Sequence, residues 1–329
     1  MSRPIVTVSN RAFASTLALL ESRFEVRAHT DNDPPSTAEL RQRAANAHAL
    51  LAFMPDRVDD AFLAACPQLR IVACALKGFD NFDIAACTRR GIWVTIVPDL
   101  LTEPTAELAV GLAIGLARHV PAADRIVRSG RFSGWRPTLY GKSLDGSSVA
   151  IVGAGRVGCA IARKLAGFSC EVRMTDPRPG AAVPPNAGIV AEADALDDAD
   201  FVFLAVPLLP ETLHMVDARW LSRLKPGALL INPARGSVVD ESAVAAALAN
   251  GSLTGYAADV FECEDWARED RPAGVTSALL DMADCTLFTT HIGSAVLRVR
   301  EAIEHDAALN IIEALQGMRP HGAVNEPPR

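Results

Sequence analysis

The sequence predicts an α/β protein made of two doubly wound parallel-sheet domains with a cleft between them. Short apolar runs alternate with helical patterns along most of the chain, which is the order expected of parallel strands covered by helices. One of these runs, at 149–152, leads into a glycine-rich turn typical of dinucleotide binding. The length of 329 residues suits two domains better than one.

The first hundred residues predict one of the two sheets. Buried strands are expected at 5–8, 49–53, 71–75 and 93–95, with a helix at 11–22. The first strand lacks a glycine fingerprint after it, so we expect this domain to bind something other than the nucleotide. Its strands end in polar loops, and ligands of open α/β sheets bind at such carboxyl ends. Lys77 follows the apolar run 71–75 closely and is one of only four lysines in the chain, which makes it a candidate ligand-binding cation.

A long helical segment is expected over residues 102–130. The letters TEPTAE supply a capping signal, and ELAVGLAIGLARHV is apolar on nearly all faces. Such a helix implies burial against another domain or a second subunit, and a homodimer is our prediction. An irregular connection with Trp135 and Tyr140 then leads to the strand at 149–152.

The stretch 149–176 predicts a dinucleotide site. Gly153, Gly155 and Gly158 have the G-x-G-x-x-G spacing between an apolar run and a helical pattern, and Asp176 lies eighteen residues beyond. The first glycine permits the tight turn, the second lets a pyrophosphate approach the backbone, and the third packs helix against strand. A carboxylate at Asp176 can accept hydrogen bonds from an adenosine ribose.

Three polar residues follow successive apolar runs in the second half of the chain: Arg235, Glu264 and His291. His291 comes directly after TLFTT, and a glutamate beside it would suit general acid–base chemistry. An arginine offers a bidentate grip on an oxyanion. The other histidines show no partner in the sequence: His29, His48, His119, His214, His305 and His321.

Composition excludes several classes of partner. The net charge of -7 gives no basic field for nucleic acid, and no apolar stretch is long enough to span a membrane. Seven cysteines without a C-x-x-C pair favour free thiols in the cytoplasm, and no motif for a metal ion is present.

The whole chain resembles the NAD-dependent D-2-hydroxyacid dehydrogenase family. The matching motifs are GAGRVG with Asp176, VPLLPET, INPARGSVVDE, YAADVFECED and HIGS. The resemblance implies catalytic roles for Arg235 (substrate anion), Glu264 (partner of the histidine) and His291 (acid or base). It also implies a cofactor site at these positions: Thr105, Gly153, Gly155, Arg156, Val157, Gly158, Asp176, Pro207, Ala234 and Asp259. Residues 101–290 would form the Rossmann NAD-binding domain, and residues 1–100 with 291–329 a flavodoxin-like substrate domain.

Within that family the chain is most similar to the phosphite (phosphonate) dehydrogenases. The motifs are AFMPDRVD, CALKGFDNFD, RSG-x-F-x-GW, GYAADVFE-x-EDWAR-x-DRP and HIGSAV followed by Arg300. This resemblance implies oxidation of phosphite to phosphate, with the anion held by Lys77, Arg235 and the Gly78 backbone. The walls of the pocket would be formed or supported by Met54, Trp135, Tyr140 and Arg300. The alternative is a glyoxylate or hydroxypyruvate reductase-like enzyme acting on a small organic acid.

Two departures from the family pattern bear on these expectations. Thr290 replaces the proline that commonly precedes the catalytic histidine. Asp176 is followed by Pro177 and Arg178. The acid repels a 2′-phosphate, so NAD is the expected cofactor, and Arg178 leaves room for weaker use of NADP.

Overall fold

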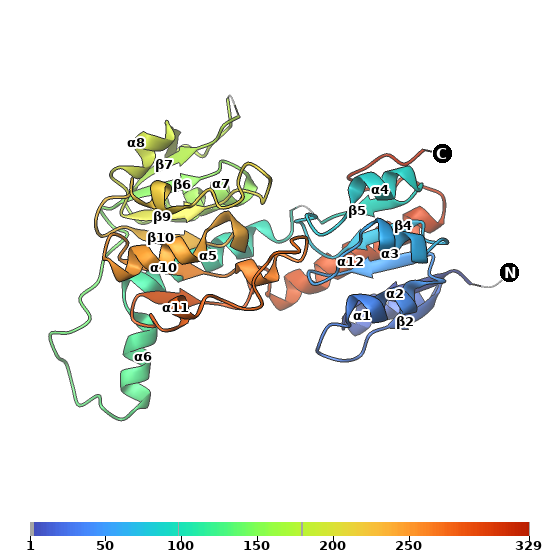
Figure 1. The fold of residues 1–329 in the computed structure, drawn as a ribbon, viewed down its shortest axis with the longest axis horizontal. Coiled ribbons are helices and arrows are strands. Elements are labelled where there is room, and N and C mark those ends of the chain that lie inside the picture. Colours follow the sequence, from blue (N-terminus) through green and yellow to red (C-terminus); the bar gives the residue numbers. More distant parts are fainter. Residues whose placement is uncertain (1–2, 98, 179, 329) are drawn as a thin grey trace. The chain divides into compact units, whose positions relative to one another are not determined.

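The computed structural model of the chain describes residues 3–97, 99–178 and 180–328. The chain divides into two compact units (Figure 1). Unit 1 comprises residues 1–101, 266–269 and 295–329, and unit 2 comprises residues 102–265 and 270–294. Residues 291–294 therefore lie in unit 2, whereas the sequence assigned them to the substrate domain, and residues 101 and 266–269 lie in unit 1, whereas the sequence assigned them to the NAD-binding domain.

The described residues of unit 1 form a five-stranded parallel sheet in the order β2-β1-β3-β4-β5. The strands are β1 (Ile5–Val8), β2 (Glu25–Ala28), β3 (Ala49–Ala52), β4 (Ile71–Cys74) and β5 (Trp93–Thr95). This is the flavodoxin-like order, as predicted. The prediction missed β2 (EVRA), because its alternating charges hide the strand.

Helices cover both faces of this sheet. The helices are α1 (Ala14–Glu21), α2 (Thr37–Ala44), α3 (Asp60–Ala65), α4 (Ile84–Arg89) and α12 (Leu297–Leu315). Buried side chains of α2, α3 and α4 share one hydrophobic cluster with the sheet, and those of α1 and α12 share another. Both faces are covered, which explains why β3 and β4 are buried at every position.

The described residues of unit 2 form a seven-stranded parallel sheet in the order β12-β11-β10-β9-β6-β7-β8. The strands are β6 (Ser148–Val152), β7 (Glu171–Thr175), β8 (Ala187–Ile189), β9 (Phe201–Leu204), β10 (Leu229–Asn232), β11 (Gly255–Ala258) and β12 (Thr286–Phe288). The order reverses between β6 and β9, as in a Rossmann sheet. The prediction of two doubly wound α/β units is confirmed.

Unit 2 is also covered on both faces. Its helices are α5 (Thr102–Ala117), α6 (Val120–Arg128), α7 (Arg156–Leu165), α8 (Glu192–Leu196), α9 (Ala218–Leu221), α10 (Glu241–Ala249) and α11 (Ser277–Leu280), with 3-10 turns η1 (Gly236–Val238) and η2 (Glu262–Glu264). The helices α5 and α7 pack on one face of the sheet, and α8 to α11 pack on the other.

The helical segment expected over 102–130 consists of two helices. The break between them comes at His119, which adopts a left-handed conformation (φ 52°), and Pro121 lies in the first turn of the second helix. The apolar character of α5 also has a different cause from the one expected. Its buried side chains pack on β10, β11 and α7 of its own unit, so a second subunit is not needed to cover them.

The predictions of free thiols and of no membrane span can be compared with the cysteines and helices of the structure. All seven cysteines are free thiols. None of the helices in the described part of the chain combines the length and apolar character needed to cross a bilayer.

Asp56 is a buried carboxylate at the carboxyl end of β3. It is 4% exposed, and it accepts hydrogen bonds from the Ser9 hydroxyl and, at 2.7 Å, from the Phe53 N–H. Burial raises the pKa of Asp56 from 3.8 to about 6, despite these two hydrogen bonds and the nearby His29. The folded state therefore favours the protonated form, and the stability from this group, complete below pH 3.8, is lost as pH rises through about 6.

Asp56→Asn is expected to stabilise unit 1 above pH 6. The amide oxygen can still accept from Phe53, while the cost of burying a charge, about 3 kcal/mol at most, disappears. Thermal unfolding from pH 4 to pH 8 should show a gain that grows with pH, and the exposed Asp31→Asn should show none. A gain independent of pH would contradict this explanation.

Candidate active site

The glycine turn after β6 has the geometry that the sequence predicted. Gly153 has φ 106°, and a Cβ there would lie 2.5 Å from the Ala205 carbonyl oxygen. A Cβ on Gly158 would lie 2.0 Å from the Gly153 carbonyl oxygen, so α7 touches the turn directly. Gly155, which precedes α7, faces open space. A phosphate can therefore approach the free N–H groups at the start of this ten-residue helix.

Asp176 closes the turn from the end of β7. Its Oδ2 accepts from the Ala154 N–H at 2.9 Å, and its side chain is 5% exposed. The exposed Arg178 forks onto the same carboxylate, with both contacts at 2.8 Å. The Arg178 guanidinium holds the pKa of Asp176 far below its usual value, so the carboxylate stays ionised. An ionised acid here fits a ribose diol and disfavours a 2′-phosphate.

His291 and Glu264 meet in the structure. The Nδ1 atom of His291 lies 2.9 Å from Glu264 Oε2, and each side chain is 26% exposed. The other carboxylate oxygen, Oε1, accepts from the Phe261 N–H at 2.9 Å. Glu264 is therefore fixed by its own turn, η2, and it orients the imidazole so that Nε2 is left for chemistry.

Asp259 holds the loop that carries His291. Its carboxylate accepts from the Thr289 hydroxyl at 2.6 Å and from the N–H groups of Ile292 and Gly293 at 2.8 Å. Its carbonyl oxygen accepts from the His291 N–H at 2.8 Å. His291 has φ 55°, a conformation unusual for a residue with a side chain, and this network compensates for it. The predicted contact of Asp259 with the cofactor stays a prediction.

Arg235 lies on the loop after β10, which packs against the turn that carries Glu264. A Cβ on Gly236 would lie 1.9 Å from the Phe261 carbonyl carbon, so the two backbones touch. Arg235 is partly buried, and its Nη1 donates to the Ala234 carbonyl at 2.9 Å. The two loops therefore bring the arginine and the His291–Glu264 pair to the same edge of the sheet.

The substrate residues predicted in unit 1 gather after β3 and β4. Arg300, on α12, donates to the Ala75 carbonyl at 3.3 Å, two residues before Lys77. Its side chain is 23% exposed, and burial lowers the pKa of the guanidinium while Glu304, 3.9 Å away, opposes this. The Met54 carbonyl accepts from Asn81 at 2.7 Å, which ties the two loops together. Lys77 and Gly78 are partly buried.

The remaining predicted residues fall into two groups. A Cβ on Gly293 would lie 3.1 Å from Asp259 Oδ2 and 3.2 Å from Thr105 Oγ1, so Thr105 lies near Asp259. Four more lie at strand ends or at the start of α7: Arg156, Val157, Pro207 and Ala234. In contrast, Trp135 and Tyr140 are 78% and 77% exposed, on a segment that extends away from the sheet of unit 2 (Figure 1). Their predicted place in the wall of the substrate pocket stays a prediction.

Sequence reasoning missed the partner of His214. Its Nε2 lies 2.7 Å from Glu262 Oε2, and its N–H donates to the Ser237 carbonyl at 2.7 Å. His29 and His321 also have partners. The acidic run ECED was the available signal for Glu262, because three acids in a turn beside buried strands need partners.

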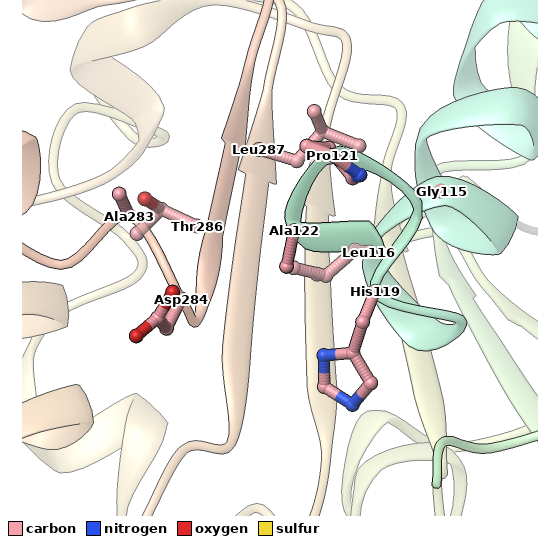
Figure 2. A pocket seen from close by; sticks show the side chains of 9 residues that line it. All are labelled: Gly115, Leu116, His119, Pro121, Ala122, Ala283, Asp284, Thr286 and Leu287. Carbon is pink, nitrogen blue, oxygen red and sulfur yellow. The ribbon is translucent and has the colours of Figure 1, made fainter. Parts of the chain in front are cut away.

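A pocket away from these residues lies where α5 and α6 meet β12 (Figure 2). It is lined by Gly115, Leu116, His119, Pro121, Ala122, Ala283, Asp284, Thr286 and Leu287. None of the residues predicted for catalysis or binding is among them. Among the described residues, no group of three or more His, Cys, Asp or Glu side chains is arranged to hold a metal ion.

Comparisons with known proteins show the family of the chain. Residues 110–293 match the family described as "D-isomer specific 2-hydroxyacid dehydrogenase, NAD binding domain". The glyoxylate reductase of Pyrococcus furiosus is 35% identical over 331 residues, which cover 98% of this chain and 96% of that protein.

Two solved structures are similar over nearly their whole length. The TT0316 protein of Thermus thermophilus superposes with a TM-score of 0.88 at 33% identity, covering 98% of this chain and 100% of that one. An NADPH-dependent glyoxylate/hydroxypyruvate reductase of Sinorhizobium meliloti, in complex with NADP and malonate, gives a TM-score of 0.84 at 31% identity, covering 99% and 98%.

Proposed function

The chain belongs to the D-isomer specific 2-hydroxyacid dehydrogenase family of NAD-dependent oxidoreductases, and we propose that His291 and Glu264 are its acid–base pair. The single observation that carries the proposal is the 2.9 Å contact between His291 Nδ1 and Glu264 Oε2, in the same unit as a glycine turn shaped for a dinucleotide. NAD is the cofactor, and Arg178 beside Asp176 leaves NADP as a weaker one.

In the proposed reaction, each of these residues has a separate role. NAD, when bound, supplies or accepts the hydride. His291 moves a proton at Nε2, while Glu264 stabilises the charged imidazole and keeps the ring oriented. Arg235 grips the substrate anion and neutralises charge at the reacting centre.

Phosphite is the first candidate substrate. Its support is the pair of cations at one strand end of unit 1: Arg300 contacts the Ala75 carbonyl, two residues before Lys77. Two cations at one strand end, Lys77 on the loop after β4 and Arg300 on α12, suit a small doubly charged anion better than a monocarboxylate. The motifs shared with phosphite dehydrogenases include these loops. The reaction joins phosphite, water and NAD to give phosphate, NADH and a proton, and His291 would take the proton from the attacking water.

Glyoxylate is the second candidate, and the names of the relatives favour it. The relatives from Pyrococcus furiosus, Thermococcus litoralis and Pyrococcus horikoshii are 34–36% identical to this chain. Each carries the name glyoxylate reductase, and none of those names mentions phosphite. In this reaction His291 would give a proton to the carbonyl oxygen as hydride reaches carbon. Sequence identity at this level indicates a shared fold and shared cofactor chemistry. It is weaker evidence that the substrate-binding loops, and therefore the substrate, are the same.

One assay separates the candidates. The purified chain with NAD and phosphite should form NADH, and Lys77→Gln should raise the KM for phosphite about tenfold, since one cation of the anion site is lost. Lys142→Gln is the matched control, because Lys142 pairs with Asp200 at 3.3 Å within unit 2 and is not among the predicted site residues.

Oxidation of NADH by glyoxylate with no turnover of phosphite would move the assignment to the second candidate. Turnover of neither substrate would count against both. An unchanged KM in Lys77→Gln would remove Lys77 from the anion site.

We also propose a homodimer in a reducing cytoplasm. The free thiols support the compartment. The dimer is supported by the apolar surface of α6 and the segment after it, where the exposed side chains are Val120, Val127, Phe132, Trp135, Leu139 and Tyr140. Such a surface on an extended segment favours burial against a partner. Sedimentation at micromolar concentration should give twice the chain mass of 34.9 kDa, and a monomer would refute the dimer.

A further inference from the structure

Three buried carboxylates lie beside the loops that carry Arg235 and Glu264. Glu241, Glu262 and Asp265 are 1%, 8% and 3% exposed. An ionised carboxylate is costly to bury unless its oxygens accept hydrogen bonds, so the groups that donate to these acids indicate what the acids hold in place.

Asp265 joins the two loops directly. Its Oδ2 accepts from the Ser237 N–H at 2.6 Å, and this contact is buried. Asp265 is the neighbour of Glu264, and Ser237 is two residues beyond Arg235. One hydrogen bond to a charged acceptor therefore links the backbone next to the acid–base pair with the backbone next to the arginine.

The other side of Ser237 is fixed as well. Its carbonyl oxygen accepts from the His214 N–H at 2.7 Å, and the His214 ring lies 2.7 Å from Glu262. Glu262 and Glu241 in turn accept from each other's N–H groups, at 3.2 Å and 2.9 Å. Ser237 is thus held between two acids of the Glu264 turn: Asp265 binds its N–H directly, and Glu262 acts through His214.

We propose that Asp265 is a positioning residue that sets the spacing between Arg235 and the His291–Glu264 pair. The close packing of Gly236 on Phe261 brings the two loops into contact. Steric contact alone does not fix how far one loop is shifted along the other. The hydrogen bond between Asp265 and Ser237 fixes this shift. This inference rests on the proposed function, which makes Arg235 the anion-binding group.

The test compares Asp265→Ala and Asp265→Asn with Asp217→Ala. Asp217 accepts from the Trp220 N–H at 2.7 Å in the same unit, so it is a matched control for a lost carboxylate–backbone hydrogen bond. Asp265→Ala leaves the Ser237 N–H without this acceptor, and amide exchange at 235–239 should accelerate about tenfold or more. In the same variant, the KM for the substrate that the wild type turns over should rise about tenfold, with NADH affinity unchanged.

Asp265→Asn should restore both values to near wild type, since the amide oxygen can still accept from Ser237. Asp217→Ala should lower the Tm without changing the exchange at 235–239 or the KM. Unchanged exchange at 235–239 in Asp265→Ala would overturn the proposal, and so would a change in KM no larger than that of Asp217→Ala. Amide exchange can be measured without turnover. If the wild type is inactive on both substrates, the proposed function fails, but the exchange rate at 235–239 still tests whether Asp265 links the two loops.

Discussion

The carboxylate of Asp259 is the constraint on which the candidate active site depends. It is 1% exposed and accepts from one hydroxyl and two N–H groups of the loop 289–293. That loop must place His291 at φ 55°, a left-handed conformation that costs about 1–2 kcal/mol for a residue with a side chain. Because the three hydrogen bonds go to one buried carboxyl group, they offset this cost and fix the direction in which the imidazole leaves the backbone.

The other parts of the site are built outward from that loop. Glu264 reaches His291 from η2, and its second oxygen accepts from Phe261, so the pair is held from both sides. The Arg235 loop lies against η2 with no room for a Cβ at Gly236. Parallel strands place all these loops at one edge of the sheet, which explains how residues far apart in sequence come together.

Much of the fold and part of the site could be predicted because their signals are local. The alternation of apolar runs with helical patterns predicted both sheets, and Gly153, Gly155 and Gly158 each have the steric role that their spacing indicates. Contacts between distant residues leave no such pattern: the pairing of His214 with Glu262, and of Asp265 with Ser237, requires the folded backbone. The break at His119 was missed because apolar periodicity continues across it.

The central claim is that Glu264 makes His291 a competent acid or base. Its most direct test is the rate of hydride transfer in a single turnover of Glu264→Gln, where the amide keeps an acceptor for Phe261 but loses the charge beside the imidazole. The rate should fall about a hundredfold while the dissociation constant for NADH stays unchanged, as expected for the loss of general acid–base catalysis. An unchanged rate, or a fall matched by an equal loss of NADH affinity, would contradict it.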